Sequence, residues 1–493
     1  MIIDTALQQR ETTGRPIRVG MVGAGATGRA IALQLGTPPP GIRLAAIANR
    51  TPDHGERAFR EAGITEWRRA ETSKQAEEAI SKGLPLLTDD PSVLTACDAI
   101  DLLVEVTGTI QEAARVALDA FEHGKHVVLV NAELDSLLGP ILKVKADQAG
   151  VVLTHTDGDE PGVAMTLLRY LRTLGLRPVA AGNIKGMVDY YRTPETQKAF
   201  AEKNDQDARK VTSFADATKL SMETTVLANA TGFQAGRRGM YGPACEHVRD
   251  VANLLPADQM IRTGLVDYAL GGAPHTGAFV IVHEESPLKR VQFAYYKLGN
   301  GPFYVFYTPF HLPHIQIAST IGRAFVHHDP TVTPIAGPVC EVVAVAKRDL
   351  KAGEHLDGVG GFCTYGLIDN APAARAMRAL PIGLSEGCLL RRDIAKDNVV
   401  SLADVEAPPV TGLAEYRQEK QHGWQPKGSE AASTKRHQAG LRTIARKRLT
   451  LRPDSGVLAG LEGFEHASLT KKNGPGCLSR TQRDAACQTE TDS

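Results

Sequence analysis

The amino-acid sequence predicts an α/β fold whose first domain contains a mostly parallel sheet. Short apolar runs alternate with helical patterns over residues 15–155, and each run ends in turn residues such as glycine, asparagine or aspartate. Parallel strands need long crossover connections, which helices usually supply, so this alternation is typical of a parallel sheet covered on both faces. A further observation, a glycine-rich turn after the first apolar run, indicates what the sheet binds.

The glycine-rich turn lies in the sequence VGMVGAGATG, which begins at Val19 and spaces its last three glycines as GxGxxG. In dinucleotide-binding (Rossmann-type) domains the first glycine allows a tight turn, the second lets a diphosphate approach the backbone, and the third permits close packing of helix on strand. The amides of the following helix then face the phosphates. A turn without a ligand is the alternative, but an apolar strand at 42–48, one helix length later, favours the dinucleotide. The expected contacts with the phosphates are Gly23, Gly25, Ala26, Thr27 and Gly28.

The second predicted strand, 42–48, ends in Asn49 and Arg50. An acidic residue at this place usually binds the free ribose hydroxyl of NAD, whereas the 2′-phosphate of NADP needs a cation. Arg50 therefore favours NADP(H), with Asn49 beside it, although Asp53 follows closely. A solvated arginine at the end of a strand is the alternative.

Further strands are predicted at 99–108, 125–131 and 151–155. Ligands of a parallel sheet bind beyond the carboxyl ends of its strands, so the residues that leave these strands should line the cleft. The expected cofactor contacts among them are Thr107, Gly108 and Asn131.

The loop after the strand 151–155 reads TDGDEPG and carries three carboxylates. Asp157 and Glu160 are candidate ligands of a divalent cation, whereas Asp159 is assigned to the turn itself. A solvated acidic turn is the alternative.

Residues 156–335 predict an α+β domain that carries the catalytic groups and a dimer contact. Asp216, Lys219 and Glu223 recur at spacings of three and four, which would place all three on one face of a helix. A lysine between carboxylates stays charged and can polarise a carbonyl group or stabilise a developing alkoxide. A solvated charged face is the alternative.

Two histidines, His311 and His314, precede an apolar helix that we expect to pack back on the first domain. Imidazole titrates near neutral pH, so either histidine could transfer a proton. Helix capping and core packing are the alternative roles.

The composition excludes several classes of partner. The 493 residues carry 56 basic and 56 acidic side chains, and this balance gives no signature of nucleic-acid or membrane binding. The chain shows no signal peptide and no apolar run of the ~20 residues that span a bilayer, so a cytoplasmic protein with a small-molecule substrate is expected. The seven cysteines form no CxxC pair and are expected to be reduced thiols.

The remaining predicted segments are an N-terminal arm (1–14), a small β-rich module (336–410) and a disordered basic tail (411–493).

The glycine fingerprint, the sequence GKHVVLVNAE at 124–133, the sequence GNIKG at 182–186 and the segment with Asp216 and Lys219 resemble homoserine dehydrogenase-type oxidoreductases. Residues 340–406 resemble a SAF domain. The pairing is similar to the subgroup that contains the type II (DXR-like) 1-deoxy-D-xylulose-5-phosphate reductoisomerases of isoprenoid biosynthesis, which use NADPH. The resemblance covers roughly residues 15–410.

This resemblance implies Lys219 as the polarising residue, with Asp216 and Glu223 in support. Lys185, together with Arg237 or Arg238, would hold an anionic group such as phosphate. Glu133 stands where homoserine dehydrogenases carry a lysine, which argues against homoserine as the substrate.

The predicted function is therefore an NADPH-dependent oxidoreductase of a small hydroxy-carbonyl substrate, with 1-deoxy-D-xylulose 5-phosphate as the first candidate. We expect a homodimer, and a divalent cation if the enzyme is a reductoisomerase. A homoserine dehydrogenase-like enzyme for a small hydroxy or amino acid is one alternative. A non-catalytic nucleotide-binding sensor is the other.

Overall fold

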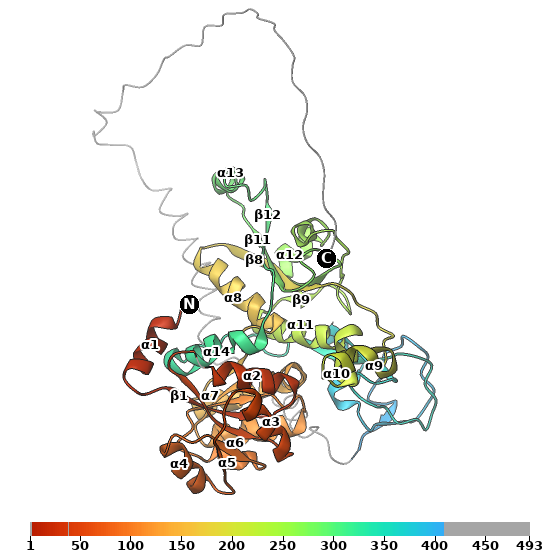
Figure 1. The fold of residues 1–493 in the computed structure, drawn as a ribbon. Helices are drawn as coiled ribbons and strands as arrows, with labels where there is room; N and C mark the ends of the chain where they lie inside the picture. The colour runs from red at the N-terminus through yellow and green to blue at the C-terminus, as the bar shows by residue number, and fades with distance from the viewer. Residues whose placement is uncertain (1, 38, 409–493) are drawn as a thin grey trace, which may run out of the picture. The chain divides into compact units, whose positions relative to one another are not determined.

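The computed structural model describes residues 2–37 and 39–408, and its first domain is built on seven parallel strands. Their order is β3-β4-β2-β1-β5-β6-β7, so β2 to β4 lie on one side of β1 and β5 to β7 lie on the other. The helices of this domain surround β1 in Figure 1. The strands are β1 (Ile17–Val22), β2 (Ile42–Ala48), β3 (Arg68–Arg69), β4 (Leu86–Thr88), β5 (Leu102–Glu105), β6 (His126–Leu129) and β7 (Leu153–His155). The helices between them are α2 (Ala26–Gly36), α3 (Pro52–Glu61), α4 (Ser73–Ser81), α5 (Pro91–Thr95), α6 (Gln111–Glu122) and α7 (Ala132–Ala149). The predicted parallel sheet is confirmed.

Both faces of this sheet are buried, which explains why its strands are apolar at successive positions. In β5, Leu102 and Val104 lie in a core shared with α2 and α3, whereas Leu103 lies in a second core shared with α6 and α7. All three side chains are fully buried. Ligand sites in such sheets occur where the strand order reverses, here between β1 and β5.

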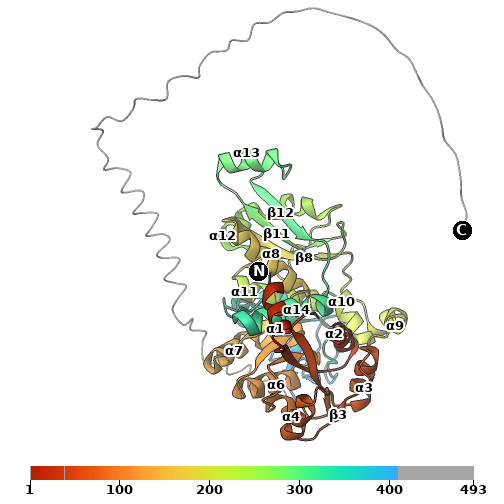
Figure 2. The same cartoon turned by 60° about the vertical axis from the view of Figure 1, so that its left-hand side comes forward.

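The N-terminal arm contains a helix, α1 (Asp4–Thr12), whose Leu7 is buried. It packs against α14 (Pro313–His327), the helix that follows His311. Ile317 and Ile321 of α14 share the core of α2 and α3, so the expectation that this helix returns to the first domain is confirmed (Figure 2).

The second domain contains a mixed sheet of five strands in the order β12-β11-β8-β10-β9. β8 pairs with β10 in parallel, and β11 is antiparallel to both β8 and β12. Its strands are β8 (Arg177–Lys185), β9 (Gln234–Ala235), β10 (Leu265–Leu270), β11 (Ala278–His283) and β12 (Phe303–Thr308). Its helices are α8 (Glu160–Thr173), α9 (Pro194–Lys203), α10 (Ala208–Ala215), α11 (Thr218–Thr231), η1 (Val248–Asn253), α12 (Ala257–Thr263) and α13 (Pro287–Tyr295).

The third segment is rich in short strands, as predicted. It consists of β13 (Cys340–Ala346), β14 (Thr364–Asn370), α15 (Ala371–Ala376), η2 (Ile382–Leu384), β15 (Leu389–Leu390) and β16 (Val405–Glu406). β13 and β14 form one antiparallel pair, and β15 and β16 form another. The predicted tail, 411–493, lies outside the described residues. Among the residues that the structure describes, no helix is both long and apolar enough to cross a bilayer.

Candidate active site

A cavity of about 560 Å³ opens where the carboxyl ends of β1, β5 and β6 meet the second domain. The first domain contributes Gly25, Ala26, Thr27, Val106, Gly108, Val130 and Glu133 to its wall. The second domain contributes charged side chains, including Asp159, Glu160, Lys185, Lys210, Lys219, Glu223 and His311. The structure thus joins the predicted cofactor turn and the predicted catalytic lysines in one space.

The glycine turn has the geometry that a diphosphate needs. Gly23 has a φ of +111°, and a Cβ on it would lie 2.8 Å from the backbone of Val106. A Cβ on Gly28 would lie 2.6 Å from the Gly23 carbonyl oxygen, so this glycine permits close packing of α2. Gly25 begins α2 without a side-chain cap, and nothing lies within 4 Å of the position of a Cβ there. The uncapped amides of α2 can therefore receive phosphate oxygens, and the residues present fit the cofactor.

Asn49 supports the turn instead of contacting the cofactor through its side chain. Its Oδ1 accepts a hydrogen bond of 2.9 Å from the Ala24 amide, and its Nδ2 donates to the Thr51 carbonyl at 2.8 Å. Arg50 follows it at the end of β2 with an exposed side chain, and we find no ion pair for it among the described residues.

Asn131 is also a structural residue, which corrects its expected contact with the cofactor. Its Oδ1 caps α7 by accepting from the Leu134 amide at 3.0 Å, while its Nδ2 donates to Glu105 Oε2 at 3.0 Å. The side chain is fully buried and does not line the cavity. Burial raises the pKa of Glu105 to about 7, although Thr107 and Asn131 donate hydrogen bonds to it. Gly108, two residues beyond Val106, does line the cavity.

Lys219 and Glu133 form an ion pair in the wall of the cavity. Lys219 Nζ, in the first turn of α11, lies 3.3 Å from Glu133 Oε2, in the first turn of α7. Burial alone would lower the pKa of Lys219, but the nearby carboxylates of Glu133, Asp159 and Glu223 outweigh it and raise the pKa above its usual value. Lys219 is therefore a permanent cation at neutral pH.

Lys185 joins two further carboxylates. It donates a hydrogen bond to Glu160, and its Nζ lies 3.6 Å from Glu223 Oε2. Burial would lower the pKa of Lys185, but Glu160 and Glu223 raise it overall. Burial and the neighbouring Glu160 raise the pKa of Glu223 well above its usual value, against the opposite effect of Lys185 and Lys219.

Asp216 does not belong to the cavity, and the prediction that it shares a helical face with Lys219 is wrong. α10 ends at Ala215, and Ala217 has a left-handed φ of +69°, so α11 begins only at Thr218. The buried Asp216 carboxylate instead accepts a hydrogen bond from Lys347 Nζ at 2.9 Å. A buried carboxylate needs such a partner, and the third segment supplies it.

The structure separates the two predicted metal ligands. Asp157 is buried outside the cavity, where its carboxylate accepts from the Gly158 amide at 3.0 Å and from Thr166 Oγ1 at 3.2 Å. Glu160 instead lies with Asp159 and His311, and one ligand atom of each falls within 4.8 Å of the others. The assignment of Asp159 to the turn alone was therefore wrong.

Asp159 is held by a buried imidazole. His155 Nε2 lies 2.8 Å from Asp159 Oδ2, and His155 Nδ1 lies 3.1 Å from Asp135 Oδ2. Burial would lower the pKa of His155, but the two carboxylates raise it to about 9. The imidazolium in turn lowers the pKa of Asp159 against the effect of burial. Asp159 is consequently ionised inside the cavity.

The two arginines expected to hold an anion point elsewhere. Arg237 Nε donates to the Met240 carbonyl at 2.8 Å, and Arg238 Nε binds Asp369 Oδ2 at 2.8 Å. Neither lines the cavity. His311 does line it, but His314, inside α14, does not.

Sequence reasoning missed Lys210 and the loop 205–207, which also line the cavity. Their polar residues follow no spacing that would separate them from an ordinary surface helix. Only their proximity to the glycine turn in the fold reveals them.

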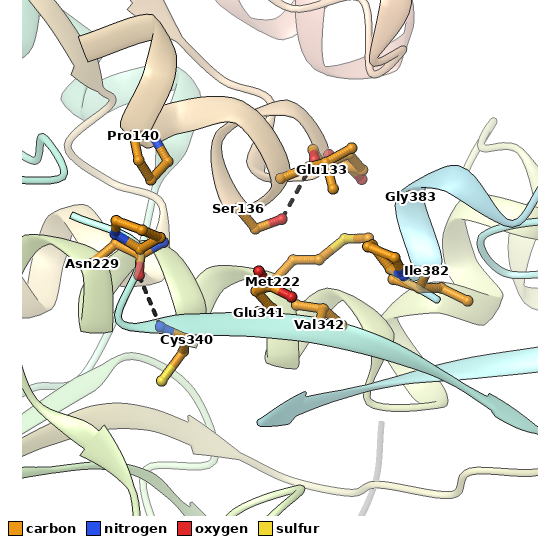
Figure 3. Close-up of a pocket in the computed structure, with 13 residues that line it drawn as sticks. Glu133, Ser136, Pro140, Met222, Asn229, Cys340, Glu341, Val342, Ile382 and Gly383 are labelled. Carbon is orange, nitrogen blue, oxygen red and sulfur yellow. Dashed lines mark hydrogen bonds between the residues drawn. The ribbon is translucent and has the colours of Figure 1, made fainter. Parts of the chain in front are cut away.

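A second cavity behind Glu133 is too small for a substrate. Its volume of about 10 Å³ accommodates one water molecule. Figure 3 shows it between Ser136, Met222 and Glu341, with Asn229 Oδ1 accepting from the Cys340 amide at one end. This cavity is a packing feature between α7, α11 and β13.

Two protein-family models match this chain. Residues 23–153 match the NAD-binding domain of homoserine dehydrogenase, and residues 158–317 match the catalytic domain of oxidoreductase DRL. A homoserine dehydrogenase from Methylobacillus glycogenes is 28% identical over 139 residues. This stretch is 27% of the present chain and 30% of that relative, so the chain spans less than a third of the length of the curated relative it matches.

Two solved structures align over most of their own length. A homoserine dehydrogenase from Thiobacillus denitrificans aligns with a TM-score of 0.37 and 17% identity, over 69% of this chain and 83% of that one. A probable dehydrogenase from Thermotoga maritima aligns with a TM-score of 0.35 and 12% identity, over 65% of this chain and 92% of that one.

The two family matches correspond to the two domains that form the walls of the cavity. An NAD-binding domain carries the glycine turn, and an oxidoreductase catalytic domain carries Lys185 and Lys219. Together they make the chain similar to NAD(P)-dependent oxidoreductases in both of these domains. They also confirm the homoserine dehydrogenase-like character of the first domain, while the reductoisomerase subgroup and the SAF domain stay predictions.

Proposed function

We propose that the protein uses NADPH to reduce the carbonyl group of a small hydroxy-carbonyl substrate, and that Lys219 polarises this carbonyl. The observation that carries the proposal is the shared cavity, which contains both the uncapped N-terminus of α2 and the Lys219 ammonium. The nicotinamide, when bound, supplies or accepts the hydride.

Lys219 is suited to its role because its charge does not depend on pH near neutrality. Glu133 holds the ammonium at 3.3 Å and keeps its pKa high. A fixed ammonium in a partly dry cavity stabilises the negative charge that develops on a carbonyl oxygen during reduction. Glu223, which lies beside Lys185 and whose pKa is raised, is the proposed proton donor to the alkoxide.

Arg50 supports NADP(H) as the cofactor. Its exposed guanidinium lies just after β2. Asn49, the residue before it, is hydrogen-bonded to the glycine turn. A cation at this position suits the 2′-phosphate, and β2 presents no carboxylate at its own end. The expected signature is tighter binding of NADPH than of NADH, reduced in R50A.

Asp159, Glu160 and His311 support a divalent cation in the same cavity. Carboxylate oxygens and an imidazole nitrogen are ligands that Mg²⁺, Mn²⁺ or Zn²⁺ accepts, and His311 Nδ1 is buried without a hydrogen-bond partner among the described residues. A metal held there would act as a Lewis acid toward a substrate oxygen.

The possible metal ligands Asp159, Glu160 and His311 favour 1-deoxy-D-xylulose 5-phosphate as the first candidate substrate. A reductoisomerase needs a group such as a divalent cation to orient two neighbouring oxygens of its substrate. A second candidate, a small amino or hydroxy acid, is favoured by the charge of the cavity. Besides Glu223, its wall carries five acidic side chains, from Glu133, Asp159, Glu160, Asp205 and Asp207, but only three lysines. Such an excess of negative charge also suits an ammonium group.

One spectrophotometric experiment tests both candidates. NADPH oxidation is followed with deoxyxylulose phosphate and Mn²⁺, and NADP⁺ reduction is followed with homoserine. We expect turnover with the sugar phosphate and its loss in K219A. If the amino-acid branch is correct, homoserine turns over instead, and E133K improves its KM. Absence of NADPH binding would overturn the proposal as a whole.

A further inference from the structure

We propose that Lys210, from the catalytic domain, binds the diphosphate of the nicotinamide cofactor. This inference rests on the proposed function, because it assumes that the glycine turn holds a dinucleotide. Lys210 lies near the start of α10 and lines the same cavity as the glycine turn. The cofactor would then be held between two domains and not by the first domain alone.

The position of the Lys210 ammonium carries the argument. A Cβ on Gly23 would lie 2.8 Å from the backbone of Val106 and 3.0 Å from the Thr107 amide, so the glycine turn packs directly against the segment 106–108. The other end of this short segment is Gly108, where a Cβ would lie 2.8 Å from Lys210 Nζ. Gly108 has no side chain and a φ of +68°, so the ammonium lies against its backbone, one residue beyond Thr107, whose amide the glycine turn approaches.

Lys210 is also free to bind an anion. Of the three lysines that line the cavity, Lys185 and Lys219 are bound to carboxylates. The Lys210 ammonium forms no ion pair or hydrogen bond within residues 2–37 and 39–408. Asp207, the nearest acidic residue in the chain, uses its Oδ1 to cap α10 by accepting from the Lys210 amide at 3.0 Å. An unpaired ammonium beside uncapped helix amides is the chemistry that recognises phosphate.

The loop before α10 fixes Lys210 over the first domain. Asp205 Oδ2 accepts from Arg29 Nη2 at 2.6 Å and from Arg57 Nη2 at 2.7 Å. These arginines lie on α2 and α3, and Glu61 contacts both of them at 3.1 Å and 2.6 Å. Asp205 is therefore a positioning residue: it anchors the catalytic-domain loop to the helix whose N-terminus faces the diphosphate.

A phosphate beside Lys210 has two possible sources, the cofactor and a phosphorylated substrate, since Lys210 also borders a neighbouring cavity of about 480 Å³. The adjacency of Gly108 to the glycine turn favours the cofactor. The experiment is designed to separate the two sources.

The test measures the Kd of NADPH for the full chain by nicotinamide fluorescence, without substrate. We expect K210M to raise this Kd about tenfold, the size of one charge-assisted hydrogen bond, and K210R to restore most of it. The inhibition constant of inorganic pyrophosphate, obtained by competition with NADPH, should also rise about tenfold in K210M. K203M is the matched control, because Lys203 is exposed at the end of α9 and does not line the cavity.

The outcomes distinguish this inference from the function on which it rests. If the wild type binds NADPH and K210M binds it equally well, the inference is wrong, and a raised KM for a phosphorylated substrate in K210M would assign Lys210 to that substrate. If the wild type does not bind NADPH, the dinucleotide site itself is wrong. D205N tests the anchor: we expect about a threefold weaker Kd at low salt and no difference at high salt, whereas an unchanged Kd at low salt removes Asp205 from the site.

Discussion

Lys219 and Glu133 form an ion pair across the boundary between the NAD-binding and catalytic domains, with Nζ 3.3 Å from Oε2. Glu133 comes from the helix that follows β6, where ligands of a parallel sheet bind. The charge of Lys219 is therefore set by a residue of the cofactor domain, and the two domains must meet for the lysine to be held in place.

Replacement of Lys219 should abolish the chemical step and leave cofactor binding intact. We expect K219M to lower kcat by roughly 10²–10³-fold, the usual effect of losing one group that stabilises an oxyanion. The Kd of NADPH should change less than twofold. Steady-state kinetics and fluorescence titration measure the two quantities, and K198M, at an exposed lysine of α9, is the control. Unchanged kcat in K219M would falsify the assigned role.

Replacement of Glu133 should change the pH dependence of the reaction. In E133Q the effect of burial remains while the largest opposing carboxylate is lost, so the pKa of Lys219 falls. Because the ammonium is the active form, the alkaline limb of the kcat/KM profile should move to lower pH. An identical limb in wild type and E133Q would show that Glu133 does not control this lysine.

The sheet and the glycine turn were predictable because they rest on local patterns. The apolar runs and their lengths give the succession of strands and helices along the chain. The GxGxxG spacing gives the turn. Neither depends on the rest of the fold. The same holds for Lys219 and Glu223, which lie on one helix with the expected spacing.

Two of the incorrect predictions share a physical cause, which is that the residue has a partner distant in the chain. Asp216 is bound by Lys347, and Arg238 is bound by Asp369. Spacing cannot reveal a pair that is separated by more than a hundred residues. In addition, the left-handed Ala217 interrupts the helix although alanine has the highest helix propensity.

Metal binding should depend on His311 and not on Asp157. After dialysis against EDTA, we expect the wild type to bind Mn²⁺, detected by the electron paramagnetic resonance signal of the free ion. H311A should bind at least tenfold more weakly, because it loses the imidazole of the set formed with Asp159 and Glu160. D157N is the matched control, since this neighbouring carboxylate lies outside the cavity. Equal affinities of H311A and wild type would exclude this ligand set.

Glu105 should make the protein less stable as pH rises. Burial raises its pKa from 4.5 to about 7 in the folded protein, so the folded state binds the proton more tightly than the unfolded state does. The free energy of unfolding from this group is therefore largest below pH 4.5 and declines as pH rises to about 7, by roughly 3 kcal/mol. Urea unfolding at pH 5 and pH 8 should show a smaller decline in E105Q, which cannot titrate. Parallel pH profiles for the two proteins would contradict the shift.

The exposed face of α13 should hold the expected homodimer together. Leu288, Val291 and Tyr295 are 80%, 64% and 73% exposed, and their spacing of three and four places them on one face of the helix. α13 lies at the end of β11 and β12, away from the first domain (Figures 1 and 2). With the adjacent Tyr296, 70% exposed, the stripe offers roughly 500 Å² per copy, against about 800 Å² per partner in a typical interface.

This stripe can therefore be the apolar centre of a two-fold contact, in which α13 of one copy packs on α13 of another. We expect sedimentation velocity at micromolar concentration to show a dimer for the wild type and a monomer for L288E/Y295E. L174E, at an exposed leucine after α8, is the control and should remain dimeric. Because α13 has no buried residues, the double substitution should leave the fold of the monomer unchanged. A dimer that persists in L288E/Y295E would place the contact elsewhere.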